Sequence, residues 1–278
     1  MTPIQFEILN NGIGTLTINR PHVRNALNWE AMYAFAETVE AAHKVPDLRT
    51  LIVTGSEGVF CAGGDLLELD DYPTHQDGVR LTTIMGDALD RLEELPCPTV
   101  AAIEGPAMGG GAEIALACDL RVMAESARLG LMHVRLAISP AWGGGQRLLR
   151  LVGYARALAW LAAGRVLSAA ETLAYRLSNL LTPDGKALEG ALEMAASFTQ
   201  QDPSTVKAIK RILRAGLMLS PTEAAAAERH ELPNLWTAPA HLEASKRFVS
   251  RKNNRPRNAN QERVSIKEKN GITSPASY

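Results

Sequence analysis

The sequence has little cysteine, no excess of one charge and no long hydrophobic run. Its 278 residues include three cysteines, Cys61, Cys97 and Cys118, which are unevenly spaced and form no CxxC pair. This pattern argues against a disulfide framework or a cysteine zinc site and favours a reducing compartment. With 29 basic and 30 acidic residues the formal charge is -1, so there is no overall basic field to hold nucleic acid.

The remaining composition is that of an ordinary globular protein. Hydrophobic residues make up 46% of the chain and charged residues 21%. No apolar run reaches about 18 residues, which argues against a membrane-spanning helix. Residues 1–7 lack the basic start and apolar stretch of a signal peptide. We therefore expect a cytoplasmic protein with neither a membrane nor a nucleic acid as partner.

Two glycine-rich turns are the most informative feature that is present. Phe60-Cys61-Ala62-Gly63-Gly64-Asp65 follows an apolar run at residues 51–54, and Gly109-Gly110-Gly111-Ala112-Glu113 follows one at residues 99–103 and opens an apolar helix. Glycine lets the backbone approach a ligand closely, and a helix N-terminus presents unpaired N–H groups. Two N–H groups that converge on one point make an oxyanion hole. The turns therefore predict a site that stabilises negative charge on an oxygen.

The hydrophobic pattern alternates between strand and helix over the first part of the chain. Residues 5–9 and 15–19 alternate apolar and polar side chains around Asn10-Asn11-Gly12, which predicts a β-hairpin. Asn28 is placed to cap a helix over residues 29–43, and helical spacing predicts another helix over residues 81–92. Strands are expected at residues 51–54, 99–103 and 119–123. This alternation predicts an α/β fold with parallel strands.

The pattern becomes helical after about residue 165. Helices are expected over residues 188–198, 205–215, 222–230 and 241–249, with Ser168, Asp202 and Ser220 at helix starts. From residue 251 onward the chain holds seven basic and two acidic residues and almost no large apolar ones, which is typical of disorder. We predict a core at residues 1–195, a helical oligomerisation region at 196–252 and a disordered basic tail at 253–278.

Several ordered motifs make the chain resemble the crotonase, or enoyl-CoA hydratase/isomerase, family. Beside the two glycine turns, these are Asn19-Arg20-Pro21 with Asn25-Ala26-Leu27, Pro98-Thr99-Val100-Ala101-Ala102-Ile103-Glu104-Gly105, Ala117-Cys118-Asp119, and Pro140 with Gly143-Gly144. The resemblance covers roughly residues 4–252. It implies a spiral of ββα units with a C-terminal helical region that builds a homotrimer or a dimer of trimers.

The resemblance also implies an acyl-CoA thioester as substrate. By position, the backbone N–H groups of Gly64 and Gly110 would hold the thioester oxygen while enolate charge develops on it. The CoA and substrate contacts that it implies are Arg24, Ala26, Ala62, Asp65, Leu66, Leu67, Phe248 and Lys252. Met108 and Trp142 lie close to the motifs, which favours the substrate pocket for them over the apolar core. Arg24 would meet a CoA phosphate or, equally, be a solvated surface arginine. Phe248 and Lys252 match positions that reach the CoA of a neighbouring subunit.

No cofactor is expected beyond the CoA that is part of the substrate. The resemblance implies no metal. The run from Gly109 to Gly111 lacks the second turn and the downstream acid of a dinucleotide-binding fold, so no nicotinamide is implied. A serine-nucleophile elbow of the GxSxG kind does not occur either.

Glu113 is the first candidate catalytic residue. Family hydratases use two glutamates, one to orient and activate water and one to deliver the α-proton, and Glu113 matches the first of them. A carboxylate in the first turn of this helix can face the oxyanion hole and act as acid or base. The alternative is a carboxylate that merely interacts with the helix dipole.

His133 is the second candidate, and it departs from the hydratase pattern. It stands where the second glutamate of the hydratases is expected. An imidazole titrates near neutrality and can act as acid or base or hold an anionic group, and the alternative is a hydrogen-bonded core residue. Nearby Arg135 is a candidate to grip a carboxylate or to face solvent. The stretch from His133 to Gly144 also resembles the ethylmalonyl-CoA decarboxylase-like branch of the family.

Three functions therefore stay open at the level of sequence. The first, which the resemblance favours, is an enoyl-CoA hydratase or isomerase that works through Glu113 and His133. The alternative is a decarboxylase of a short malonyl-type CoA such as ethylmalonyl- or methylmalonyl-CoA, which needs the enolate hole but no base to remove a proton. A third is a protein that binds acyl-CoA without turning it over.

Overall fold

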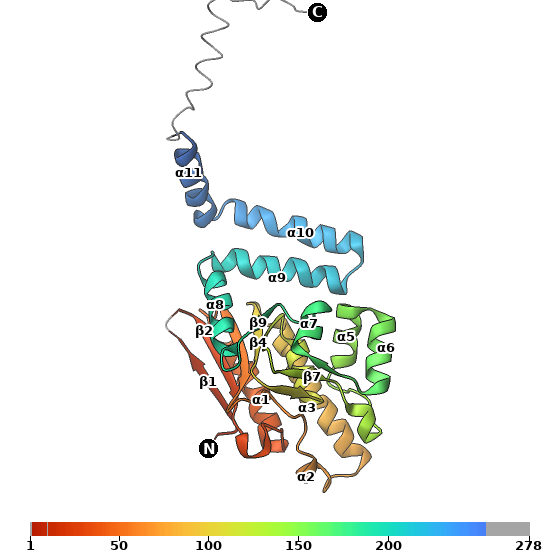
Figure 1. Cartoon of the computed structure of the whole chain (residues 1–278). Helices are drawn as coiled ribbons and strands as arrows, with labels where there is room; N and C mark the ends of the chain where they lie inside the picture. The colour runs from red at the N-terminus through yellow and green to blue at the C-terminus, as the bar shows by residue number, and fades with distance from the viewer. Residues whose placement is uncertain (1, 10, 254–278) are drawn as a thin grey trace, which may run out of the picture. The chain divides into compact units, whose positions relative to one another are not determined.

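The computed structural model describes residues 2–9 and 11–253, with the side chains of residues 251–253 excepted. Its main sheet has six strands in the order β1-β2-β3-β4-β6-β9 (Figure 1). β1 (Ile4–Ile8) and β2 (Ile13–Ile18) form the expected antiparallel hairpin. β3 (Thr50–Gly55), β4 (Thr99–Ile103), β6 (Leu120–Ala124) and β9 (Leu180–Thr182) then pair in parallel, which confirms the α/β fold.

A second, smaller sheet was not predicted. It consists of β5 (Pro106–Met108), β7 (Arg128–Gly130) and β8 (Val166–Ser168), in that spatial order. β5 pairs with β7 in parallel and β7 with β8 in antiparallel orientation. Each strand has three residues, which is too short for an alternating pattern to emerge from the sequence.

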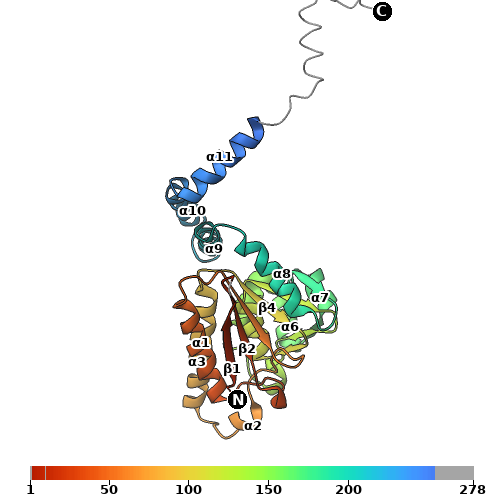
Figure 2. The same ribbon diagram turned by 90° about the vertical axis from the view of Figure 1, so that its left-hand side faces the viewer.

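Helices cover both faces of the main sheet. α1 (Trp29–His43) and α3 (His75–Glu94) lie on one face, and α8 (Ala187–Thr199) lies on the other (Figure 2). Because side chains alternate along a strand, Leu51 and Val53 pack in the same cluster as Phe35 of α1. Ile52 between them packs with Ala191 of α8. The apolar run at residues 51–53 of β3 is thus buried on both faces of the sheet.

The predicted helix starts agree with the observed caps. Asn28 accepts a hydrogen bond from the Ala31 N–H at 3.0 Å, and Asp202 accepts one from the Thr205 N–H at 2.9 Å at the start of α9 (Pro203–Met218). Ser168 caps α7 (Ala169–Ala174) in a capping box. The helix predicted over residues 81–92 was too short. The observed helix starts at His75, before the predicted start at residue 81, because Thr74 and Asp77 form a capping box there.

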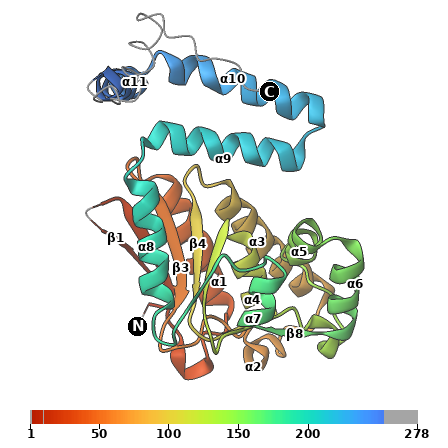
Figure 3. The same cartoon turned by 45° about the horizontal axis from the view of Figure 1, so that its top comes forward.

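The remaining helices of this part are short and lie around the second sheet. They are η1 (Pro21–Val23), α2 (Leu66–Leu69), α4 (Gly110–Ala117), η2 (His133–Leu136), α5 (Gly144–Val152) and α6 (Tyr154–Ala163). α4 contacts both α3 and α5, and α5 contacts α6 (Figure 3). The helix after the second glycine turn is therefore enclosed by other helices.

Contacts divide the chain after Ser220 into two units. The first unit includes α8 and α9, whereas the sequence prediction grouped residues 196–252 together. The second unit begins at Pro221 and contains α10 (Pro221–Trp236) and α11 (Pro239–Asn253), where Trp236 stacks on His241 at 4.7 Å. The tail predicted at 253–278 lies outside the described residues, apart from the backbone of residue 253. No helix in the described ranges has both the length and the apolar character that crossing a membrane requires.

A buried ion pair fixes α9 to the main sheet. The Nζ of Lys210 donates to Asp119 Oδ2 at 2.6 Å and to the carbonyl of Cys97 at 2.9 Å. The same Asp119 oxygen accepts from the N–H of Thr99 at 2.7 Å, at the start of β4. The carboxylate of Asp119 thus connects the beginnings of β4 and β6 to α9, which lies nearly a hundred residues later in the sequence.

We expect Lys210→Met to lower the free energy of unfolding by about 1–3 kcal/mol, because Asp119 loses a charged donor. Urea denaturation of both proteins, compared at equal m-values, measures this difference. Lys207→Met, one turn earlier on α9, is the matched control and should change stability by less than about 0.5 kcal/mol. An equal loss in the two variants would contradict the role of the ion pair.

Candidate active site

The two predicted glycine turns lie against each other. The N–H of Cys61 donates to the carbonyl of Pro106 at 3.2 Å, and the carbonyl of Cys61 accepts from the N–H of Met108 at 2.9 Å. Gly63 has a φ of +101°, and a Cβ built on it would lie 3.1 Å from the nitrogen of Gly110. The missing side chain therefore lets the first turn approach the start of α4 closely.

The structure shows the backbone around each predicted oxyanion donor. Leu27 donates to the carbonyl of Gly63 at 2.7 Å and accepts from the N–H of Asp65 at 2.9 Å, so this parallel bridge turns the N–H of Gly64 away from Leu27. Gly110 is the first residue of α4, and its N–H has no acceptor within the helix. That these two N–H groups hold a thioester oxygen stays a prediction.

Glu113 is buried, and both oxygens of its carboxylate have partners. It is 1% exposed, one turn into α4. Its Oε1 accepts from the N–H groups of Trp142 and Gly144, each at 2.9 Å. Its Oε2 lies 3.0 Å from Nε2 of His133. The partners of the carboxylate thus come from η2, from the loop before α5 and from the first residue of α5. They do not come from the N-terminus of α4 itself.

His133 lies beside Glu113, as the sequence prediction requires. It begins η2, and its side chain is 11% exposed. Because Nε2 faces a carboxylate oxygen, a proton on that nitrogen points to Glu113. Nδ1 is buried and has no hydrogen-bond partner within the described part of the chain. Since buried polar atoms are nearly always paired, this nitrogen is a candidate contact for a ligand.

Trp142 connects the carboxylate to the predicted oxyanion hole. Its ring is 5% exposed, and a Cβ on Gly110 would lie 2.1 Å from the ring atom Cζ3. A Cβ on Gly144 would lie 2.4 Å from Cγ of Glu113. Glycine is therefore needed at both places, because the indole and the carboxylate occupy the space. The sequence predicted Trp142 as a pocket residue. It did not predict that the N–H groups of Trp142 and Gly144 donate to Glu113. The glycine run at residues 143–145 was the sequence feature that pointed to a close backbone approach at this place.

Arg135 does not share this arrangement. Its Nη2 donates to the carbonyl of Gly164 at 2.7 Å, at the C-terminal end of α6. Its guanidinium therefore serves the loop after α6. Of the two cationic residues suggested for a substrate carboxylate, the structure brings His133 to Glu113 and directs Arg135 elsewhere.

The residues expected to contact CoA around the first turn are brought near one another by the backbone. Arg24 is exposed with a left-handed φ of 56°, and its carbonyl accepts from the N–H of Ala62 at 3.1 Å. Asp65 is buried, and Oδ2 pairs with Nη1 of Arg20 at 3.0 Å. The same Arg20 nitrogen donates to the carbonyl of Ala26. The side chain of Asp65 is thus already occupied.

The other expected contacts are scattered in exposure and position. Leu66 and Leu67 project from α2, and Leu67 is 88% exposed. Met108 is half-buried beside Gly63. Phe248 is exposed on α11 in the second unit. The side chain of Lys252 lies outside the described residues. None of these assignments is tested by the structure alone.

Cys61 stands in the first turn but is not a nucleophile. Burial raises the pKa of its thiol to about 12. The thiol therefore stays protonated at neutral pH, whereas nucleophilic cysteine is the thiolate. Burial likewise raises the pKa of Cys97 to about 11 and that of Cys118 to about 12.

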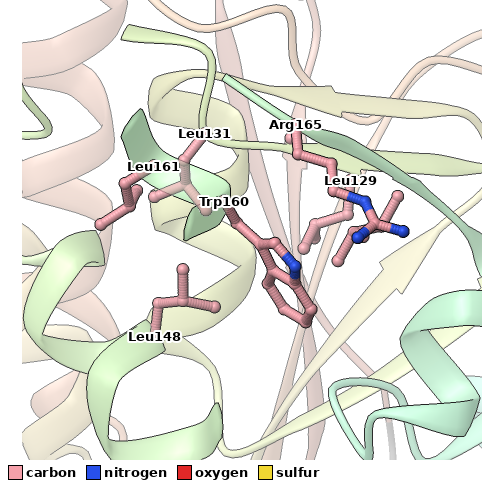
Figure 4. A pocket seen from close by; sticks show the side chains of 8 residues that line it. Leu129, Leu131, Leu148, Trp160, Leu161 and Arg165 are labelled. Carbon is pink, nitrogen blue, oxygen red and sulfur yellow. The ribbon is translucent and has the colours of Figure 1, made fainter. Parts of the chain in front are cut away.

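A small apolar pocket between β7, α5 and α6 is too small for a substrate. Its volume is about 10 Å³, which holds about one water molecule. Figure 4 shows that Leu129, Leu131, Leu148, Trp160, Leu161 and Arg165 line it. It contains neither Glu113 nor His133, so the polar groups around Glu113 mark the candidate site better than this cavity does.

The comparison with protein families agrees with the motifs and the fold. The model of the enoyl-CoA hydratase/isomerase family matches residues 9–255. The chain belongs to this family. An enoyl-CoA hydratase of Bacillus anthracis superposes with a TM-score of 0.85 at 30% identity, covering 90% of this chain and 96% of that chain. The fold is thus of the crotonase type, and the protein is an acyl-CoA-acting enzyme of this family.

Curated relatives carry two different activities in their names. Ethylmalonyl-CoA decarboxylase of Rattus norvegicus is 35% identical over 244 residues, which cover 87% of this chain and 82% of the relative. Enoyl-CoA hydratase EchA19 of Mycobacterium tuberculosis is 38% identical over 202 residues, which cover 72% of this chain and 76% of the relative. Family membership therefore leaves the reaction itself open.

We expect Gly110→Ala to reduce kcat about 10²-fold or more, although alanine keeps the N–H. The new Cβ would overlap the ring of Trp142 and displace the loop that holds Glu113. Steady-state kinetics on the preferred acyl-CoA ester measures this effect. Gly145→Ala is the control, because its Cβ would meet its nearest atom at 3.9 Å. Full activity of Gly110→Ala would contradict the placement of the site.

Proposed function

We propose that this protein decarboxylates a malonyl-type CoA thioester with a short branch, such as methylmalonyl- or ethylmalonyl-CoA. The observation that carries this proposal is the unpaired Nδ1 of His133, on an imidazole whose Nε2 lies 3.0 Å from Glu113. In this proposal both ring nitrogens carry a proton, and the Glu113 carboxylate is the counter-charge. The charged ring presents Nδ1–H as a buried donor, which suits a substrate carboxylate.

The proposed reaction needs no base. The thioester oxygen accepts from the N–H groups of Gly64 and Gly110, and Nδ1–H of His133 orients the carboxylate. The bond between Cα and the carboxylate carbon breaks, CO₂ leaves, and the electron pair moves into an enolate whose oxygen lies in the oxyanion hole. The proton on Nδ1 then passes to Cα, which gives the saturated acyl-CoA and a neutral imidazole. Solvent restores that proton.

Glu113 has a supporting part in this scheme. Two backbone N–H groups donate to Oε1 and fix the orientation of its carboxylate. The charge on Oε2 then balances the imidazolium until the proton has left. In the serine-protease triad, too, a buried carboxylate supports a histidine that moves a proton. No nucleophile takes part in the scheme proposed here.

The curated relatives support this choice of substrate. Ethylmalonyl-CoA decarboxylases of Rattus norvegicus and Mus musculus are 35% and 36% identical to this chain. Their alignments cover 87% and 84% of it. The resemblance of the stretch around His133 to this branch points the same way.

Hydration of an enoyl-CoA is the second candidate. It is favoured by the presence of Glu113 with an acid–base group 3.0 Å away, and by the relative named enoyl-CoA hydratase EchA19. In that scheme Glu113 would activate water and His133 would deliver the α-proton. Both schemes use the same enolate and differ in whether the substrate carries a carboxylate.

The purified protein should be incubated separately with crotonyl-CoA, methylmalonyl-CoA and ethylmalonyl-CoA, and the products read by mass spectrometry. We expect the malonyl esters to lose the mass of CO₂ and crotonyl-CoA to remain unchanged. A gain of the mass of water on crotonyl-CoA alone would replace the proposal by hydration. Tight binding of all three without turnover would indicate an acyl-CoA-binding protein.

Variants of His133 test the role of Nδ1. His133→Gln should lower kcat about 10²–10⁴-fold, because an amide cannot deliver the proton. It should also weaken binding of a malonyl ester but leave the affinity for butyryl-CoA, which lacks the carboxylate, unchanged in titration calorimetry. Glu113→Gln should lower kcat about 10²-fold or more, because the imidazolium loses its counter-charge. His230→Gln, on the exposed surface of α10, is the control. Equal weakening for both esters would contradict the carboxylate contact.

We further propose that the chain forms a trimer or a dimer of trimers. Large apolar side chains are exposed on α9 and on the helices of the second unit, among them Leu213, Leu217, Trp236 and Phe248. Soluble monomers rarely expose so many without a partner. Sedimentation equilibrium should give three or six times the mass of 30.0 kDa. A monomer at micromolar concentration would overturn this proposal.

A further inference from the structure

We propose that Arg147 is a positioning residue for Glu113 and acts through the turn at residues 142–144. This inference rests on the part that Glu113 has in the proposed function, but not on which acyl-CoA ester is turned over. Arg147 touches neither Glu113 nor His133. It holds the backbone that holds the carboxylate.

The turn contains three consecutive peptide groups, and each has a defined partner. The first donates to Glu113 through the N–H of Trp142, and the third donates to the same oxygen through the N–H of Gly144. The carbonyl of the middle peptide, that of Trp142, accepts from Nη1 of Arg147 at 2.6 Å. Fixing the middle peptide plane restricts the direction of the N–H groups on either side, because only the two backbone dihedrals of a single residue separate each neighbouring plane from it.

The guanidinium is itself held from the opposite side. Nη2 donates to Asp90 at 2.7 Å and Nε to Glu93 at 3.1 Å, both on α3. The side chain of Arg147 is 4% exposed. Arginine presents its donors in a rigid fork, so three acceptors in fixed directions define its position. The turn is thus tied to a long helix that packs on the main sheet.

Gly143 shows how closely the turn and the guanidinium fit. Its φ is +88°, and a Cβ on it would lie 2.4 Å from Nη1 of Arg147. Any side chain at this position would push the guanidinium away from the turn. The glycine therefore serves both the backbone conformation and the approach of Arg147.

A plain structural ion pair is the competing interpretation, and Arg150 offers the comparison. It lies one turn further along α5, and its Nη1 is 3.4 Å from the same Glu93. It donates to the carbonyl of Gln146 and makes no hydrogen bond with the turn at residues 142–144. If joining α5 to α3 were the whole role of these arginines, both would matter in the same way.

The test compares Arg147→Lys with Arg150→Lys in the full-length enzyme, on the ester that the wild type turns over. Lysine keeps the charge, but its single nitrogen cannot reach three acceptors that are arranged around three different guanidinium nitrogens. We expect Arg147→Lys to lower kcat about 10–100-fold with KM unchanged, because Glu113 is misplaced while acyl-CoA binding is retained. Arg150→Lys should keep kcat within about twofold of the wild type. A purely structural role would lower stability without this separation of kcat from KM.

A double variant sharpens the result. If Arg147 acts through Glu113, then Arg147→Lys should cause no further fall of kcat in the Glu113→Gln background. Multiplying effects would overturn the inference, as would an unchanged kcat in Arg147→Lys alone. Full activity of Glu113→Gln would instead overturn the role of Glu113 in the proposed function, so the two failures are distinguishable.

Asp90→Asn provides the same test without risk to the fold. The side chain of Asp90 is 71% exposed, and the change removes the charge of one of the two carboxylates that hold Arg147. We expect kcat to fall several-fold with KM unchanged and the melting temperature nearly unchanged. If Arg147→Lys fails to fold and Asp90→Asn keeps full kcat, the inference is wrong.

Discussion

The burial of the Glu113 carboxylate is the constraint on which the site depends. A charge that is 1% exposed is stable in a protein interior only when donors replace the water it has lost. Here these donors are two backbone N–H groups and one imidazole. Each of them requires its own segment to pass within hydrogen-bonding distance of α4. The need to stabilise one charge therefore dictates the course of the chain from η2 to α5.

The glycines of the site follow from the same constraint. Gly144 must lack a side chain because the Glu113 carboxylate fills that space, and Gly110 must lack one because the ring of Trp142 does. The ring thus lies between the start of α4 and the turn that holds Glu113. Through Arg147 this turn is connected to α3, and α3 packs on the main sheet. The contacts that position Glu113 for the proposed reaction are thus part of the same network that stabilises the first unit.

Local signals in the sequence were sufficient for most of the main sheet and its helices. The helix from Trp29 to His43 and the strand from Thr99 to Ile103 have the predicted bounds, because a cap or a continuous apolar run marks each of them. The second sheet was missed because its strands have three residues each. Such strands form only when distant segments are brought together. The length of α3 was underestimated because its first turns face solvent and show no hydrophobic repeat.

The sequence by itself determined the family, the two glycine turns, and Glu113 and His133 as the residues of interest. These follow from residue types at fixed spacing along the chain, and such spacing can be recognised in a sequence. Only the tertiary structure decided the partners. It directs Nε2 of His133 to Glu113 and leaves Nδ1 unpaired, sends Arg135 to Gly164, and places the N–H groups of Trp142 and Gly144 on the carboxylate. The physical reason is that hydrogen bonds between groups about twenty to thirty residues apart depend on how helices and loops pack, and spacing in the sequence does not encode that packing.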